Sequence, residues 1–86
     1  MSDSELKRLQ AARLLEFTWL EAVESPLTGR ALRDLRLPEN YGISVVAVIR
    51  GENFVPNPGA EFIIYPGDIV GLLGTETKLA AFRKTL

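Results

Sequence analysis

The chain has 86 residues, of which 47% are hydrophobic and 24% are charged, and this is the composition of one small globular domain. Ten basic and eleven acidic residues give a net charge of −1, which argues against the broad basic surface of a nucleic-acid-binding protein. The chain contains no cysteine and no histidine, which excludes disulfides, thiolate or imidazole metal sites, and serine–histidine or cysteine–histidine catalysis.

No segment of the sequence predicts insertion into a membrane. Uninterrupted apolar runs are short, as in residues 45–49, whereas a membrane-spanning helix needs about 20 apolar residues. The N-terminus carries acidic residues where a signal peptide carries basic ones. We therefore expect a cytoplasmic protein. A domain of this length buries only about 60% of its unfolded surface, so a second copy would supplement its thin core.

The beginning of the chain predicts a linker helix followed by a strand. Residues 3–13 indicate a short polar helix, which we interpret as a linker ahead of one domain over residues 14–86. Leu15, Phe17 and Trp19 alternate with polar residues, so the segment they share predicts a half-buried strand. Their apolar stripe is expected to lie in the core or at a dimer interface.

The middle of the chain predicts a helix and a central strand. Residues 30–37 place leucines at helical spacing, and Pro38 is expected to stop this helix because the residue before proline avoids helical geometry. Residues 40–42 (NYG) indicate a turn. Residues 43–50 (ISVVAVIR) are apolar on both faces, which is typical of a strand buried on both sides. Residues 51–59 (GENFVPNPG) indicate a loop, which is long enough to cover another part of the protein.

The last third predicts two strands and a helix. Residues 61–65 and 69–73 read as strands around the tight turn 66–68 (PGD), and Gly71 indicates a close backbone approach or a bulge. Thr75 is a favourable N-cap for a final helix. Leu79, Phe82 and Leu86 are expected to share one face of that helix. The predicted order is (α)-β-α-β-β-β-α, an α+β fold with a small antiparallel or mixed sheet and short helices packed on one face.

Three segments, in this order and spacing, carry a resemblance to a known family. They are SPLTGRALRDLRL (25–37), YGISVVAVIRGE (41–52) and IIYPGDIVGLLG (63–74). Together they resemble the C-terminal domain of the regulators of potassium conductance, also called the TrkA-C domain. The resemblance covers about residues 15–82. It implies a two-fold dimer in the cytoplasm, attached directly or through a larger parent chain to a potassium channel, a potassium uptake system or a cation/proton antiporter.

The resemblance also implies a nucleotide effector and no catalytic activity. Some members of the family bind cyclic di-AMP at the dimer interface, and others bind different ligands. Relatives that bind cyclic di-AMP tend to carry a basic residue shortly before the Tyr–Gly turn, where this chain has Pro38 and Glu39, and Arg36 is the nearest base. The expected effector is therefore either cyclic di-AMP or another nucleotide. No G-x-G-x-x-G sequence occurs, so a Rossmann-type dinucleotide site is not expected.

Several polar residues are candidates for contacts with such an effector. The planar guanidinium of Arg50 suits a phosphate or a carboxylate, although a surface ion pair with Glu52 would also explain it. Arg30 stands where a helix is expected to begin, and it either binds an anion or is simply solvated. Asn40 and Tyr41 either line a pocket at the dimer seam or pack within the fold. The candidate ligand-binding residues are Arg50, Tyr41, Asn40, Arg30 and Arg36.

No metal site is expected, because Asp68 has no neighbouring carboxylate and an aspartate in a turn commonly bonds its own backbone. The two-sided apolar strand supplies the expected homodimer interface, which consists of Ile43, Val45, Val46 and Val48. Two functions remain open. The first is a ligand-sensing domain that binds a small anionic effector at the dimer interface. The second is a homodimerisation module of a transporter that binds no ligand.

Overall fold

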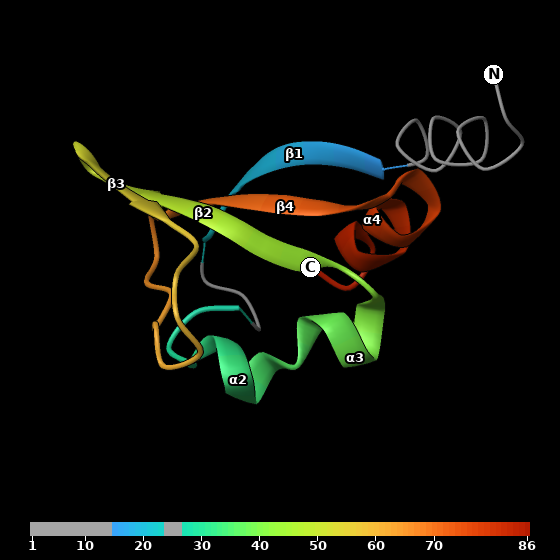
Figure 1. Ribbon diagram of the computed structural model, residues 1–86, viewed down its shortest axis with the longest axis horizontal. Coiled ribbons are helices and arrows are strands. Elements are labelled where there is room, and N and C mark those ends of the chain that lie inside the picture. Colours follow the sequence, from blue (N-terminus) through green and yellow to red (C-terminus); the bar gives the residue numbers. More distant parts are fainter. Residues whose placement is uncertain (1–14, 24–26) are drawn as a thin grey trace, which may run out of the picture.

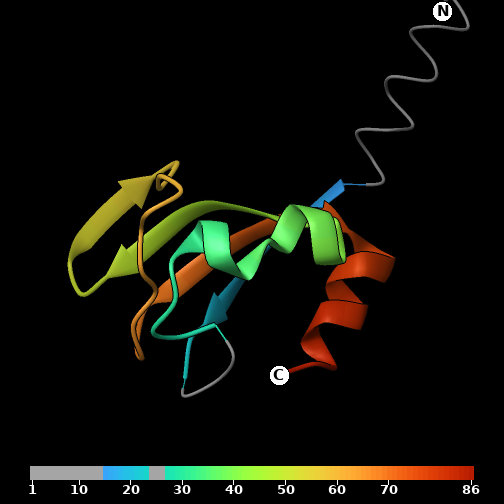
Figure 2. The same ribbon diagram turned by 90° about the horizontal axis from the view of Figure 1, so that it is seen from below.

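A computed structural model describes residues 15–23 and 27–86 of the chain. Its strands are β1 (Leu15–Glu21), β2 (Ser44–Arg50), β3 (Asn53–Pro56) and β4 (Ile69–Thr75), and its helices are α2 (Leu32–Leu35), α3 (Leu37–Tyr41) and α4 (Glu76–Arg83). The strands form one antiparallel sheet in the order β1-β4-β2-β3. Helices α2 and α3 lie under one face of the sheet, and α4 lies at its end (Figures 1 and 2). The predicted α+β class is confirmed.

Some sequence-based expectations concern residues outside the described part of the chain. The linker helix predicted over residues 3–13 is one of them. Within the described residues, none of the helices has the length and hydropathy that crossing a membrane requires.

Strand β1 confirms the alternation expected for it, but the stripe of Leu15, Phe17 and Trp19 is exposed in the single subunit, so its expected place in the core is wrong. The strand also explains the glycine in β4. Phe17 and Trp19 lie on one face of the sheet, with their rings edge to face and their centroids 4.9 Å apart. A Cβ atom on Gly71 would lie 2.9 Å from each ring, so the backbone of β4 passes directly beneath the two aromatic side chains. The predicted close approach at Gly71 is confirmed.

Strand β2 is central, as predicted, because it lies between β4 and β3. Its register with β4 shifts between Val45 and Ala47, which leaves Val46 as an extra residue in the strand. Ala47 and Val48 are buried, whereas Val45 and Val46 are only half-buried in the single subunit. Burial on both faces therefore holds for the middle of β2 but not for its beginning.

The segment between β2 and β4 differs from the prediction in two places. The expected loop over residues 51–59 contains β3, which forms a two-residue hairpin with β2. Gly51, the first turn residue, has φ +60°, and Pro56 is tolerated because β3 is an edge strand. The expected strand over residues 61–65 forms only an isolated bridge, from Ile63 to Ala31, because its neighbour is the entry to α2 and not a strand.

The helix predicted over residues 30–37 is broken into two, and the expected role of Pro38 is wrong. Helix α2 ends before Arg36, whose φ of +49° is left-handed, and α3 begins immediately after it. Pro38 stands in the first turn of α3, where a missing N–H has no helical partner to lose. Tyr41 is the last helical residue, and the chain turns at Gly42, which has φ +68°.

Helix α4 closes one end of the core. The side chain of Thr75 accepts a hydrogen bond from the Lys78 backbone N–H at 3.2 Å, so the predicted N-cap is confirmed. Leu79 and Phe82 are buried as expected, but Leu86 is exposed because the helix ends at Arg83. The largest fully buried side chains of the core are Ile43, Val48, Ile64, Val70 and Leu72.

Candidate ligand groove

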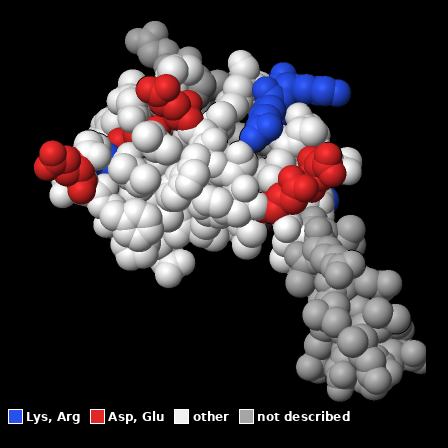
Figure 3. All heavy atoms as spheres, turned by 90° about the horizontal axis from the view of Figure 1, so that it is seen from above, with Lys and Arg blue, Asp and Glu red and all other residues white. Residues whose placement is uncertain are grey.

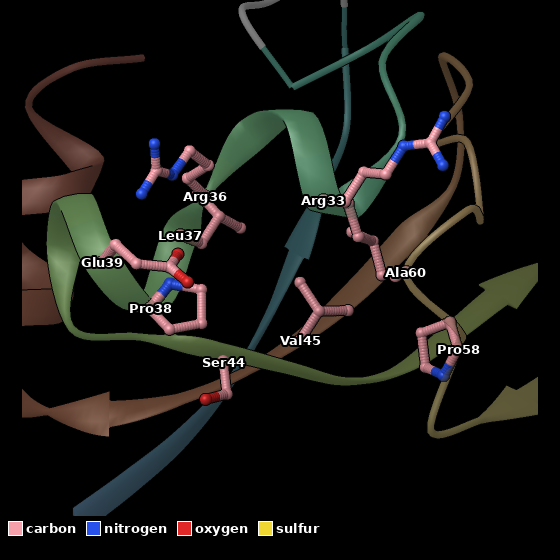
Figure 4. A pocket seen from close by; sticks show the side chains of 10 residues that line it. Arg33, Arg36, Leu37, Pro38, Glu39, Ser44, Val45, Pro58 and Ala60 are labelled. Atoms are coloured by element: carbon pink, nitrogen blue, oxygen red, sulfur yellow. The ribbon is translucent and has the colours of Figure 1, made fainter.

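A groove of about 390 Å³ opens between the two short helices and the beginning of the central strand. Its volume lies in the range of small-molecule sites. Val45 of β2 lies at its centre in the close-up view, Pro38 of α3 lies to one side, and Pro58 and Ala60 form the opposite wall (Figure 4). The lining residues are Leu32, Arg33, Arg36, Leu37, Pro38, Glu39, Ser44, Val45, Pro58 and Ala60.

The walls of this groove are held by backbone hydrogen bonds between α2 and the segment after β3. The Leu32 N–H donates to the Phe62 carbonyl at 3.0 Å, and the Arg33 N–H donates to the Ala60 carbonyl at 2.9 Å. Arg33 also reaches Glu61, with 3.1 Å between Nη1 and Oε1, but both side chains are exposed and such a pair contributes little. The groove therefore has a fixed backbone frame with exposed charged side chains above it.

The charges at the groove rim have both signs. The guanidinium groups of Arg33 and Arg36 lie on opposite sides of Val45 in the view, and Glu39 lies on the same side as Arg36 (Figure 4). Among the described residues, the Arg36 side chain forms neither a hydrogen bond nor an ion pair. A free guanidinium beside an apolar floor can bind phosphate or carboxylate in two-pronged geometry.

Arg50, the first candidate for a ligand contact, is instead bound within the protein. Its Nε donates to Asp68 Oδ1 at 2.9 Å, and its Nη2 donates to Asp68 Oδ2 at 2.7 Å and to the Ile63 carbonyl at 2.8 Å. The guanidinium lies over the rings of Phe62 and Tyr65, 4.8 and 4.9 Å from their centroids. The ion-pair interpretation is therefore correct for Arg50, but its partner is Asp68 and not Glu52.

The carboxylate of Asp68 is almost completely buried, with 3% of its side chain exposed. The hydrogen bonds from Arg50 lower its pKa, the bond from the Tyr65 backbone N–H at 2.9 Å adds to this effect, and desolvation opposes it. The same pairing raises the pKa of Arg50. The interaction of Asp68 with its own turn backbone confirms the structural interpretation of the PGD motif.

The other candidate residues are divided between two places. Arg36 lines the groove, whereas Arg30, Asn40 and Tyr41 line a second hollow of about 220 Å³ between the short helices and α4. The Tyr41 ring packs edge to face on Phe82, with centroids 5.1 Å apart, which favours the packing interpretation. The Asn40 side chain donates to the Leu35 carbonyl at 3.4 Å. The sequence prediction therefore does not describe one single site.

The expected dimer interface is divided as well. Ile43 and Val48 have no exposed surface in the single subunit, because they pack in its core, so they offer nothing to a second copy in this conformation. Val45, on the groove floor, and Val46, at the bulge, are the two members of that set that retain exposed surface.

Sequence reasoning missed several groove residues, chiefly Arg33, Ser44, Pro58 and Ala60. Arg33 had no usable signal, because helical spacing would place it beside Arg36, whereas the left-handed break at Arg36 puts the two guanidinium groups on opposite sides of Val45. Pro58 and Ala60 had no such signal. They reach the groove only because the chain from β3 to β4 passes beneath the sheet beside α2, as Figure 2 shows.

Comparison with known proteins identifies relatives of the whole domain. The family model of the TrkA-C domain matches residues 19–86. The Ktr system potassium uptake protein C of Bacillus subtilis (strain 168) is 37% identical over 60 residues, which are 70% of this chain and 27% of that protein. The chain thus spans about a quarter of this curated relative's length.

Two solved structures extend the comparison. The regulator of conductance of K+ (RCK) C domain of the potassium transport protein KtrA, in complex with cyclic di-AMP, matches with a TM-score of 0.79 and 30% identity over 100% of both chains. The RCK_C domain dimer of S. agalactiae BusR, also in complex with cyclic di-AMP, matches with a TM-score of 0.73 and 23% identity over 84% of this chain and 90% of that chain.

Proposed function

Because the chain belongs to the TrkA-C domain family, we propose that it is a regulatory, ligand-sensing domain of a potassium or other cation transport system. The domain comprises residues 14–86, residues 1–13 serve as its linker, and it performs no catalysis. It acts in the cytoplasm as a homodimer, without binding nucleic acid. It transmits the binding of its effector to a channel or a cation/proton antiporter, either directly or within a larger parent chain.

We propose that a small anionic effector binds in the groove, where two copies of the domain meet. The observation that carries this proposal is the unpaired Arg36 beside the apolar floor of the groove. It is supported by the KtrA RCK C domain, which matches over the whole chain and whose structure was solved in complex with cyclic di-AMP. Val45 and Pro58 offer apolar surface to a base, and Arg33 and Arg36 offer charge to phosphates. Effector binding shifts the equilibrium between two arrangements of the subunits only by the difference between the effector's affinities for them.

Glu39 restricts which anion the groove accepts. Its carboxylate lies at the rim on the same side as Arg36, so it repels a second negative charge there (Figure 4). A doubly charged ligand such as cyclic di-AMP would meet this repulsion in both subunits, whereas another nucleotide with hydrogen-bond donors near Glu39 would not. This supports an effector other than cyclic di-AMP and makes Glu39 a specificity residue.

Isothermal titration of the purified chain with cyclic di-AMP, together with its mass in solution, tests the site. We expect Arg36→Asn to weaken nucleotide binding by about 10- to 150-fold, since one charge-assisted hydrogen bond contributes roughly 1.5–3 kcal/mol. Asparagine tolerates the left-handed backbone at this position. Glu39→Gln should strengthen binding of the dianion, and Lys84→Gln, at the end of α4, is the control. Equal binding by the Arg36 variant and by wild type would contradict the groove site.

The alternative is a dimerisation module that binds no ligand. Its support is the half-exposed Val45 and Val46 on either side of β2, which a second copy could cover without any effector. A clean dimer that gives no heat with cyclic di-AMP or with other cyclic and linear nucleotides would favour this alternative.

A further inference from the structure

The second hollow, between the short helices and α4, combines an apolar floor with two opposite charges at its rim. Its volume of about 220 Å³ is below the usual range of drug-sized sites, so only a small molecule fits. The floor consists of Leu27, Leu35, Leu37 and Phe82, which are all buried. Because these side chains belong to the core, the shape of the floor does not depend on a ligand.

The two charges belong to Arg30 and Asp34, whose side chains are both exposed. Among the described residues, no ion pair joins these two side chains, and the Arg30 side chain forms no hydrogen bond. Asp34 Oδ1 lies 3.7 Å from Arg33 Nε, an exposed contact that contributes little. The hollow therefore presents a free guanidinium and a weakly engaged carboxylate beside one apolar surface.

The backbone holds Arg30 at this position. Gly29 has φ +80°, and its N–H donates to the Ile64 carbonyl at 2.8 Å, while the Ile64 N–H donates to the Arg30 carbonyl at 3.4 Å. Ile64 itself has no exposed surface. These two bonds fix the backbone beside the hollow, so a ligand needs to order only the Arg30 side chain.

We propose that this hollow is a second ligand site, which takes a small zwitterion with an apolar side chain, the chemistry of an α-amino acid such as leucine. The ligand's carboxylate binds Arg30 in the two-pronged geometry that a guanidinium favours, and its ammonium group donates to Asp34. Its apolar side chain lies on Phe82 and the leucines, which removes apolar surface from water. A simple anion would satisfy Arg30 but would be repelled by Asp34.

This site is distinct from the effector groove. Among the residues that line the two, only Leu37 is shared. Arg33 and Arg36 belong to the groove, whereas Arg30 and Asp34 belong to the hollow. Binding in the hollow therefore requires neither the nucleotide nor the dimer.

Titration of the isotope-labelled chain with L-leucine, followed by backbone amide chemical shifts, tests this site. We expect saturable shifts at Asn40 and Thr85, which line the hollow, and none at Ser44 and Ala60, which line the groove. Isocaproate, which is leucine without its amine, should bind about 10- to 150-fold more weakly, because it leaves Asp34 without a charged hydrogen-bond donor.

Two variants locate the ligand's carboxylate. Arg30→Gln should weaken leucine binding by a similar factor, about 10- to 150-fold, because the charged donor is lost. Arg83→Gln is the matched control, since Arg83 is an exposed arginine of α4 that does not line the hollow, and it should leave leucine binding unchanged.

Three results would overturn the proposal. The first is the absence of saturable shifts with leucine, and the second is shifts confined to the groove residues. The third is equal affinity for leucine and isocaproate, which would show that the ammonium group makes no contact. This comparison of two ligands uses the wild-type chain, so it remains decisive even where Arg30→Gln fails to fold.

Discussion

Arg50 ties the end of the central strand to the segment that forms one groove wall. Its guanidinium bonds Asp68 and the Ile63 carbonyl and lies against Phe62 and Tyr65. Arginine suits this position because its planar fork matches a carboxylate and its face stacks on aromatic rings. This side chain adds to the backbone hydrogen bonds that hold residues 62–68, such as the one from the Gly67 N–H to the Ala22 carbonyl at 2.6 Å.

Replacing the buried carboxylate tests this role. Asp68→Asn removes the charge with little change of volume, and it leaves Arg50 without its ionic partner. We expect the free energy of unfolding to fall by about 2–3 kcal/mol, as for other charge-assisted hydrogen bonds. Urea unfolding measures it. Asp34→Asn, at an exposed position whose nearest cation is 3.7 Å away, is the control and should change stability by under about 0.5 kcal/mol. Similar losses in both variants would contradict the structural role of the pair.

The same carboxylate predicts how stability depends on pH. Its pKa is lower in the folded state than in the unfolded chain, mainly because Arg50 bonds its charged form. Its stabilising contribution is therefore complete above the unfolded-state pKa of about 3.9 and is lost as the pH falls through the lower folded-state pKa. Urea unfolding from pH 7 down to about pH 2 should show this loss in wild type, and Asp68→Asn should show a smaller one. Parallel pH profiles would refute the assignment.

Among the elements, β4 depends on two glycines for different reasons. Gly71 admits the rings of Phe17 and Trp19, whereas a Cβ on Gly74 would lie 2.8 Å from Cγ2 of Ile43, a fully buried core residue. Ile43 lies in the connection between α3 and β2, and it packs so closely on β4 that position 74 has no room for a side chain.

Gly74→Ala should reduce stability by about 1–3 kcal/mol, as for other overpacked cores. Gly59→Ala is the matched control, because a Cβ atom there would have no neighbour within 4 Å and its φ is not left-handed. This control should be neutral or slightly stabilising. Thermal unfolding of the two variants beside wild type measures the difference. Equal unfolding midpoints for the two variants would contradict this explanation, because they would show that the Ile43 side chain moves aside without strain.

Local signals in the sequence were enough to predict most elements but not their partners. The alternation of β1, the apolar run of β2 and the Thr75 cap are local features, and the structure confirms all three. The sequence predicts a loop at residues 53–56, which form a strand, and a strand at residues 61–65, which form only an isolated bridge, because strand formation depends on the neighbouring segment. The former pairs with β2 in a hairpin, whereas the latter lies against the entry to α2.

At the scale of the whole molecule, the sheet separates two surfaces with different chemistry. One side holds the groove with its charged rim, and the other exposes the apolar side chains of Phe17 and Trp19 and carries its charged groups at the edge (Figure 3). The sequence could suggest an anion site, since Arg36 does line the groove, but it could not show that Arg30 and Tyr41 belong to a separate hollow. That division depends on the left-handed break at Arg36, which directs the two short helices differently.

The proposed dimer predicts that stability depends on protein concentration. A domain this small has a thin core, and Val45 and Val46 at the beginning of β2 stay half-exposed in the single subunit. If two copies unfold together, each tenfold rise in concentration adds about 1.4 kcal/mol to the free energy of unfolding. The urea midpoint of the chain should therefore rise steadily when the protein concentration is raised about a hundredfold, which adds about 2.8 kcal/mol.

The groove variants locate the seam. Pro58→Glu places a charge on the groove wall outside the sheet ladder, so it should abolish the concentration dependence while the monomer stays folded. Phe17→Gln, at an exposed position on the opposite face of the sheet, should preserve that dependence. A midpoint that does not change with concentration in wild type would refute the dimer. A dependence that disappears only in the Phe17 variant would move the seam to that opposite face.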